Sequence, residues 1–376
     1  MKQINYLVIV FIGATLLCNC SAGKKTTSPA ASIPSLKDVF KNDFAIGTAL
    51  NTAQIEGKDP KAAALVEQQF NMATPENIMK AEVIHPEWNR YNFEPGDQLV
   101  SYGEKNKIRI NAHTLIWHSQ LPAFARQIQS ADSFRLFFQQ HISTVAGHYR
   151  GKVFSWDVVN EALNEDGTMR KSVFLNKLGE GFVTEAFRMA AAASPGTELY
   201  YNDYNNEQPA KRAGCIRLIK MIQAAGVRID GVGIQGHWHA GKVPLQDIEQ
   251  SIIEYSALGL KVMFTELDLE VLPRDFQGAD VSQQMKNSPA MNPYPNALPD
   301  SVQQLLARDY SSLFKLFLKY RENVTRVTFW GVNDGQSWLN GWPVPGRTNY
   351  PLLFDREFKP KPAFYSVIAT KQASAN

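Results

Sequence analysis

The stretch WDVVNEALN runs from Trp156 to Asn164. It places an amide and a carboxylate, Asn160 and Glu161, directly after a run that is apolar except for Asp157. Short apolar runs of this composition are typical of buried strands. Because polar groups are costly to bury without partners, a strand that ends in this way indicates a polar site at its end.

The complete run around this stretch is VFSWDVVNEA from Val153. Seven further short, β-rich runs that end in polar or glycine residues recur along the chain. The others are DFAIGTAL from Asp43, QFNMATPEN from Gln69, IRINAHTLIW from Ile108, ELYYNDYN from Glu198, GVGIQGHW from Gly231, KVMFTELDL from Lys261 and RVTFWGVND from Arg326. Helical patterns lie between most of them. Eight strands alternating with helices predict an α/β fold, a single (β/α)8 TIM barrel. A doubly wound sheet is the alternative, but no glycine-rich phosphate loop follows the first strand.

The composition is that of an ordinary globular protein, with 44% hydrophobic and 20% charged residues in 376. The net charge of +3, without a run of Lys or Arg, gives no support to a nucleic-acid partner. Seven Trp, 13 Tyr and 21 Phe suit core packing, and they also suit a cleft that stacks on sugar rings. Among the three cysteines we expect Cys215 to be a buried apolar residue, with no disulfide framework and no cysteine-based metal site.

The first residues indicate export. Lys2 precedes the apolar run YLVIVFIGATLL, which is too short to span a membrane well. Cys20 follows this run as the lipid-bearing cysteine of a lipoprotein signal would, and an ordinary signal peptide cut near Ala22 is the alternative. We therefore expect a monomeric cell-envelope lipoprotein, periplasmic or outer-surface, or a secreted protein, with membrane contact only through the lipid. The predicted organisation is a signal peptide over 1–20, a tether over 21–35, the barrel over 36–370 and a disordered tail over 371–376.

Two carboxylates stand out among the polar strand ends. The catalytic residues of such barrels lie at the C-terminal ends of the strands, and MFTELDLEVLP places Glu266 at the end of the seventh. The fourth and seventh strands lie across the lumen, so Glu161 and Glu266 can face each other. Cleavage of a glycosidic bond needs such a pair, one to protonate the leaving oxygen and one to attack the sugar or activate water. The irregular segment 272–299 follows the seventh strand and is expected to border the cleft.

The environments of the two glutamates should differ. Glu266 and Asp268 share one face of their strand, so His237 could be oriented by Asp268 and hydrogen-bond Glu266. That arrangement would help to keep Glu266 ionised. Glu161 needs a raised pKa to act as an acid, and the charge of Glu266 would help to raise it.

These motifs together resemble glycoside hydrolase family 10, whose main members are endo-β-1,4-xylanases. The resemblance runs from about Leu36 to Ile368. WDVVNEA resembles the family's acid/base segment, with Glu161 in that role, and FTELDL resembles the nucleophile segment, with Glu266. The resemblance implies endo-acting, retaining hydrolysis of xylan or xylo-oligosaccharides without cofactor or metal, with the carboxyl groups about 5–5.5 Å apart.

Further segments extend the resemblance: TPENIMK, HTLIWHSQLP, YYNDYN, GIQGHW, WGVNDGQSW and GRTNYPLLFD. It implies that sugar is held by Glu76, Asn77, Lys80, His113, Trp117, Gln120, Asn160, Tyr204, Gln235, His237, Trp330 and Trp338. Tyr204 would be the platform for the leaving sugar, and Arg347 would be a rim contact. The family usually has Trp after the lysine of TPENIMK, where this chain has Ala81.

Each of these residues has a plainer interpretation when taken alone. Glu76 and Lys80 could form an i, i+4 ion pair on a helix. Trp330 and Trp338 could belong to the core. The remaining polar candidates are expected to be structural or superficial: Asp157 and Asp203 as structural partners, His141 and His148 as surface or capping residues.

Two other classes of protein stay open. The H-x-H of His237 and His239, with His113 and His118, could belong to a metal-dependent barrel hydrolase, although those enzymes carry H-x-H on the first strand. A non-catalytic glycan-binding lipoprotein would keep the aromatic residues but would not need both glutamates. Chain-internal and chain-end attack are also both open, because the 272–299 loop could partly close the cleft.

Overall fold

The computed structural model describes residues 1, 3, 33–276 and 278–373. Cys20, nearly all of the predicted signal peptide and most of the predicted tether therefore lie outside the described residues. The chain divides into two units, residues 1–33 and 34–376, and the second contains every element named below. No helix in the described part of the chain is both long and apolar enough to cross a membrane.

Eight parallel strands close into a barrel, as predicted. The described residues form nine strands, and all but β7 make up the closed ring: β1 Ala45–Leu50, β2 Met72–Pro75, β3 Arg109–Trp117, β4 Ser155–Asn160, β5 Glu198–Asp203, β6 Gly231–Ile234, β7 His237–His239, β8 Lys261–Glu270 and β9 Val324–Phe329. Neighbours pair in the order β6-β5-β4-β3-β2-β1-β9-β8, and the parallel pairing of β6 with β8 closes the ring. The predicted sixth strand, GVGIQGHW, corresponds to two strands in the structure. These are β6 in the barrel and the short β7, which pairs with β8.

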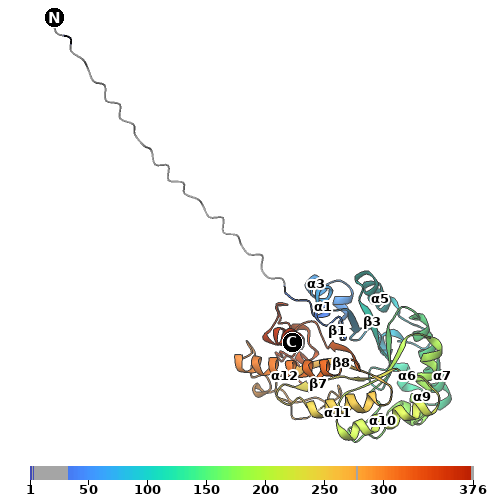
Figure 1. Ribbon diagram of the computed structural model, residues 1–376. Helices are drawn as coiled ribbons and strands as arrows, with labels where there is room; N and C mark the ends of the chain where they lie inside the picture. The colour runs from blue at the N-terminus through green and yellow to red at the C-terminus, as the bar shows by residue number, and fades with distance from the viewer. Residues whose placement is uncertain (2, 4–32, 277, 374–376) are drawn as a thin grey trace. The chain divides into compact units, whose positions relative to one another are not determined.

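Helices surround the barrel and follow one another in sequence order, as the colours of Figure 1 show. They are α1 Leu36–Val39, α2 Thr52–Ile55, α3 Pro60–Gln69, α4 Ala81–Ile84, α5 Glu94–Asn106, α6 Ala123–Gln127, α7 Ala131–His148, α8 Val173–Leu178, α9 Phe182–Ala193, α10 Pro209–Ala224, α11 Leu245–Ser256, α12 Asp300–Lys319 and α13 Pro362–Ala373. Short 3-10 turns cover Pro289–Met291, Asp334–Gln336 and Trp338–Asn340.

Local sequence explains several element boundaries. Asp59 caps α3 by accepting a hydrogen bond from the backbone N–H of Ala62, and Pro60 occupies the first helical position, where no N–H is needed. Ser130 caps α7 in the same way. Every residue of β4 is buried, because a barrel strand has side chains of the lumen on one face and helices on the other.

The core lies between the barrel and its helices, and it corrects one prediction. Phe134, Phe137 and Phe138 of α7 are buried, and each such side chain contributes about 1.5–3 kcal/mol of transfer free energy. Cys215 is buried, as expected. His141 is buried as well, with Nε2 2.9 Å from the carbonyl oxygen of Leu115, so its prediction as a surface or capping residue is wrong. An isolated histidine in a helical pattern gave no sign of this partner.

The predicted C-terminal boundary is also too early. α13 continues to Ala373, so residues 371–373 are helical and not part of a disordered tail. Lys371 pairs with Asp43, which lies just before β1. This ion pair links the two ends of the barrel sequence, and residues 374–376 lie outside the described part.

Candidate active site

A pocket of about 140 Å³ lies at the C-terminal ends of the strands, where the sequence placed the site. Its lining consists of Glu76, Asn77, Lys80, His113, Trp117, Gln120, Asn160, Glu161, Gln235, His237, Glu266, Ala279, Val281, Trp330 and Trp338. All of the residues predicted to contact substrate are among them, with the exceptions of Tyr204 and Arg347. Ala279 and Val281 come from the 272–299 segment, which borders the cleft as expected.

Glu161 follows β4 in a backbone conformation that is uncommon for a residue with a side chain. Its φ is 56°, in the left-handed region, and such residues cluster at functional sites. Two hydrogen bonds hold the backbone there: Glu161 N–H donates to the carbonyl of Asn202 at 2.9 Å, and Nε of Arg170 donates to the Glu161 carbonyl at 3.1 Å. The strained turn directs a carboxylate into the pocket, which explains the abrupt polar end of WDVVNEALN.

The carboxyl group of Glu161 has a raised pKa. Burial is the largest cause, and the charge of Glu266 adds to it, while hydrogen bonds from Gln235 and Trp117 act in the opposite direction. Nε1 of Trp117 donates to Oε2 at 2.9 Å, and Nε2 of Gln235 donates to Oε1 at 3.0 Å. The raised pKa agrees with the prediction, but burial and not Glu266 is its main source. A protonated Glu161 can donate a proton.

Glu266 lies near the middle of β8, and its pKa is lowered, in contrast to that of Glu161. Burial alone would raise its pKa, but the hydrogen bond from His237, the nearby imidazoles of His113 and His237 and the amide of Asn202 together lower it. Nδ2 of Asn202 donates to Oε1 at 2.8 Å, and Nε2 of His237 lies 3.1 Å from Oε2. Glu266 is therefore held as a carboxylate inside the protein.

His237 and Asp268 form the predicted orienting pair. Nδ1 of His237 lies 3.0 Å from Oδ1 of Asp268. Burial would lower the pKa of His237, but Asp268 and then Glu266 raise it to about 10. Nε1 of Trp338 donates to the other oxygen of Asp268 at 2.8 Å, which fixes the carboxylate and places the Trp338 ring beside the imidazole.

Asn202 and Arg170 are functional residues that sequence reasoning missed. Nδ2 of Asn202 donates both to Glu266 and to Oδ1 of Asn160, and Thr265 fixes the amide by donating to its Oδ1. Asn202 lay in a polar strand end, YYNDYN, so its position was a usable signal. Arg170 lies in a loop with no recognisable pattern, and only the fold shows that it supports Glu161.

A polar cluster over β2 and β3 surrounds Lys80. Nζ of Lys80 donates to Asn77 at 3.1 Å and to Gln120 at 2.8 Å, and it lies 4.7 Å from the centre of the Trp117 ring. Glu76 and Lys80 precede α4 and do not share a helix, so the helical ion-pair interpretation is wrong. The pKa of Glu76 is raised by burial, against the lowering effect of Lys80.

Asp157 and Asp203 are structural partners, as predicted. Oδ2 of Asp157 accepts from Nδ2 of Asn111 at 3.1 Å and lies 2.9 Å from Nδ1 of His113, whose ring contacts Trp330 edge-on. Asp203 pairs with the buried Lys211 at 2.9 Å. Neither carboxylate lines the pocket.

Tyr204 and Arg347 lie differently from the predicted contacts. Only 4% of Tyr204 is exposed, with Arg170 donating to its hydroxyl at 2.7 Å and Nζ of Lys211 3.7 Å from its ring centre. Gly278 of the 272–299 segment lies against its ring. The side chain of Arg347 is 1% exposed and pairs with Glu270 at 2.6 Å, so the prediction of a rim contact is wrong.

The histidines do not form a metal site. In the part of the chain that the structure describes, no group of three or more His, Cys, Asp or Glu side chains is placed to hold a metal ion. His237 and His239 lie on β7 and not on β1, and both ring nitrogens of His237 face carboxylates. The metal-dependent alternative has no support in these residues.

A closed parallel barrel defines a barrel glycoside hydrolase when its cleft of polar and aromatic side chains holds one glutamate with a raised pKa and one with a lowered pKa. The family model described as "Glycosyl hydrolase family 10" matches residues 35–370. The chain belongs to glycosyl hydrolase family 10, and the resemblance found in the sequence is confirmed.

Relatives and solved structures agree with this assignment. The chain is 43% identical to "Endo-1,4-beta-xylanase A" of Xylanibacter ruminicola over 90% of this chain and 94% of that protein. It is 37% identical to "Beta-1,4-xylanase" of Dictyoglomus thermophilum over 97% and 99%. A GH10 endoxylanase from a sugarcane soil metagenome superimposes with a TM-score of 0.86 at 41% identity, over 89% of this chain and 99% of that one.

Proposed function

We propose that this protein hydrolyses internal β-1,4 bonds of xylan by retaining double displacement, with Glu161 as acid/base and Glu266 as nucleophile. The observation that carries the proposal is that two buried glutamates in one connected site have pKa values shifted in opposite directions. Burial raises the pKa of Glu161, whereas His237 and Asn202 outweigh burial at Glu266 and lower its pKa.

The chemistry follows from this arrangement. Protonated Glu161 gives its proton to the glycosidic oxygen as the carboxylate of Glu266 attacks the anomeric carbon, so the leaving chain departs with a hydroxyl group. A covalent ester to Glu266 remains. Since that ester has no negative charge, one cause of the raised pKa of Glu161 disappears, and Glu161 can take a proton from water. The water attacks the anomeric carbon, releases Glu266 and restores the original configuration.

The residues of the Lys80 cluster hold the half of the chain that becomes esterified. Asn77, Lys80 and Gln120 present hydrogen-bonding groups to sugar hydroxyls, and Glu76 and His113 extend this polar wall. Trp117, Trp330 and Trp338 supply flat apolar faces on which sugar rings pack. Asn160 holds the hydroxyl next to the reacting carbon, an interaction that strengthens in the transition state. Gln235, which donates to Glu161, sets the direction of its proton.

Product analysis over time on unsubstituted xylan tests the proposal, with a cellulose-derived glucan beside it. We expect an early spread of mixed oligomers from xylan for the wild type and none for Glu266→Ala. Glu322→Ala, an exposed glutamate, is the matched control and should behave as the wild type. Release of a monomer or dimer alone from the start contradicts internal cleavage, and unchanged activity in Glu266→Ala contradicts the role of the nucleophile.

We also propose that the enzyme is exported and carries lipid on Cys20. This lipid is its only proposed contact with a membrane, and the enzyme acts as a monomer. The apolar run followed by Cys20 supports this proposal. Metabolic labelling with a fatty acid should mark the wild type but not Cys20→Ser, with Cys18→Ser as the control. Labelling that persists in Cys20→Ser contradicts it.

A further inference from the structure

A second cavity, of about 390 Å³, adjoins the active site and shares His237 with it. Its walls come from the residues after β5, from β7 and from the segment after β8. The polar cluster around Lys80 lies instead over β2 and β3. The cavity therefore lies towards the half of the chain that leaves, beyond Tyr204.

Arg274 is a buried cation in the wall of this cavity with incomplete partners. Its side chain is 3% exposed, and neither Nε nor Nη1 has a hydrogen-bond partner within the described structure. The nearest carboxylate is Glu270, 3.4 Å from Nε. Oε1 of Glu270 already accepts hydrogen bonds from Arg347 at 2.6 Å and from Asn349 at 3.2 Å. One carboxylate thus faces two guanidinium groups, with Oε2 towards Arg274 and Oε1 towards Arg347, and Asp268 adds a further negative charge that is shared with His237.

The other described charged groups around the cavity do not give Arg274 a further hydrogen-bond acceptor. Lys242 is exposed and carries its positive charge at the hydrated rim. His239 lies 3.4 Å from Glu270, but burial and the nearby cations lower its pKa to about 4, so it is neutral at pH 7. Asp275 is exposed and Asp247 is half-buried, which keeps both carboxylates hydrated at the rim. Among the described residues, the buried Nε and Nη1 of Arg274 therefore remain without a hydrogen-bond acceptor.

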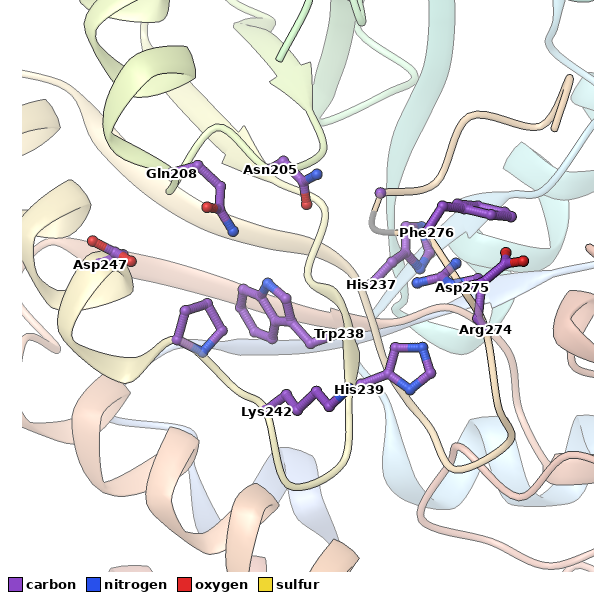
Figure 2. A pocket seen from close by; sticks show the side chains of 12 residues that line it. Asn205, Gln208, His237, Trp238, His239, Lys242, Asp247, Arg274, Asp275 and Phe276 are labelled. Atoms are coloured by element: carbon purple, nitrogen blue, oxygen red, sulfur yellow. The ribbon is translucent and has the colours of Figure 1, made fainter. Parts of the chain in front are cut away.

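Two aromatic rings lie against the guanidinium of Arg274. The guanidinium carbon of Arg274 lies 5.2 Å from the ring centre of Phe276 and 4.9 Å from that of Trp342. Aromatic rings are not conventional hydrogen-bond acceptors, so these contacts leave the N–H groups of Arg274 able to donate to a ligand. Figure 2 shows Arg274 and His239 entering from different segments, with Asn205 and Gln208 across the cavity and Trp238 between.

We propose that this cavity binds the carboxylate of a uronic-acid substituent on the leaving half of a xylan chain, with Arg274 as its counter-ion. The inference rests on the proposed function and names the substrate class more narrowly. A carboxylate supplies the two acceptor oxygens that a planar guanidinium matches. Neutral arabinosyl or acetyl groups cannot supply a charged acceptor to the unpartnered N–H groups of Arg274, so the cavity selects acidic decorations.

The experiment compares three xylo-oligosaccharides of equal length: unsubstituted, substituted with a uronic acid on the leaving half, and the same compound with its carboxyl group reduced to an alcohol. For the wild type we expect kcat/KM on the acidic compound to exceed that on the reduced compound by about tenfold, as a buried charge-assisted hydrogen bond would give. Arg274→Gln should bring this ratio close to one, and Arg274→Lys should keep part of it. Arg321→Gln, which removes an exposed arginine, should keep all of it.

The outcomes separate the inference from the function on which it rests. If the wild type cleaves the unsubstituted compound but shows equal kcat/KM on the acidic and reduced compounds, the inference is overturned and the xylanase function stands, whatever the folding of the variants. A ratio that survives in Arg274→Gln also overturns it, because another group then reads the carboxylate. If the wild type cleaves none of the three, the proposed function itself fails.

Discussion

Nε2 of His237 lies 3.1 Å from Oε2 of Glu266, and this contact sets the charge of the proposed nucleophile. With a pKa of about 10, His237 is an imidazolium at neutral pH and donates from both ring nitrogens, one to Glu266 and one to Asp268. The donors to the carboxyl group of Glu161 in the described structure are uncharged: Gln235, Trp117 and Asn160. Two equally buried glutamates thus differ in protonation because one has a cationic partner.

Asp268→Asn should move the acidic limb of the pH profile to higher pH. Asp268 is the main group that opposes the effect of burial on His237, so its loss lowers the pKa of His237 and weakens the charged donor to Glu266. The pKa of Glu266 then rises. We expect kcat/KM near neutral pH to fall by about 10- to 100-fold, the worth of a hydrogen bond to a charged group. Measurement of kcat/KM from pH 4 to 9 checks both effects, with exposed Asp132→Asn as control. An unshifted acidic limb would remove the orienting pair.

Glu161→Ala should discriminate between leaving groups. An aryl xyloside with an acidic phenol does not need protonation to depart, so its rate of glycosylation should change little. A substrate with a poor leaving group should lose about 10²–10⁴-fold, the usual contribution of a general acid. Pre-steady-state rates with a series of aryl xylobiosides make the comparison. Equal losses across the series would contradict the acid role of Glu161.

Gly233→Ala should disturb the active site indirectly, by displacing the side chain of Asn202. A Cβ on Gly233 would lie 2.3 Å from Oδ1 of Asn202 and 2.8 Å from Thr265, so the Asn202 amide must move. That movement disturbs its hydrogen bonds to Glu266 and Asn160. We expect kcat/KM to fall by about tenfold or more and stability to fall by about 1–3 kcal/mol, as for overpacking.

Gly147→Ala is the matched control for this substitution. Gly147 lies in α7, and no atom lies within 4 Å of an added Cβ. Alanine there should raise the stability by about 0.5–1 kcal/mol through its helix propensity, with unchanged kinetics. Thermal unfolding and kcat/KM of both variants make the test. Wild-type kinetics in Gly233→Ala would show that Asn202 does not need its present position.

The sequence predicted those parts of the molecule that depend on local pattern. Alternating strands and helices predicted the barrel, and the residues at the strand ends predicted the pocket, because parallel strands in a barrel bring their C-terminal ends together. What it missed depends on contacts between distant segments. Arg170 supports Glu161 from a loop without a motif, and Arg347 turned inward to Glu270. His141 was misplaced for the same reason, because its partner is the backbone of β3.

The buried histidine pair predicts how the fold responds to acid. Nδ1 of His85 lies 3.2 Å from Nδ1 of His141, and the rings stack in parallel. Burial, and then the charge of His85, lower the pKa of His141 to about 3, and burial also lowers the pKa of His85. Both rings are therefore neutral in the folded protein. A histidine of the unfolded chain takes up its proton near pH 6.5.

Because the unfolded chain binds more protons, stability from this pair is complete above pH 6.5 and is lost as pH falls from 6.5 towards about 3. The loss is on the order of a few kcal/mol at most. His141→Gln, whose amide can still donate to the Leu115 carbonyl, should lower the unfolding temperature at pH 7 but make its decline between pH 6.5 and 4 shallower. Exposed Gln139→Ala serves as the control on the same helix. An equally steep decline in His141→Gln and the wild type would assign the acid sensitivity to other groups.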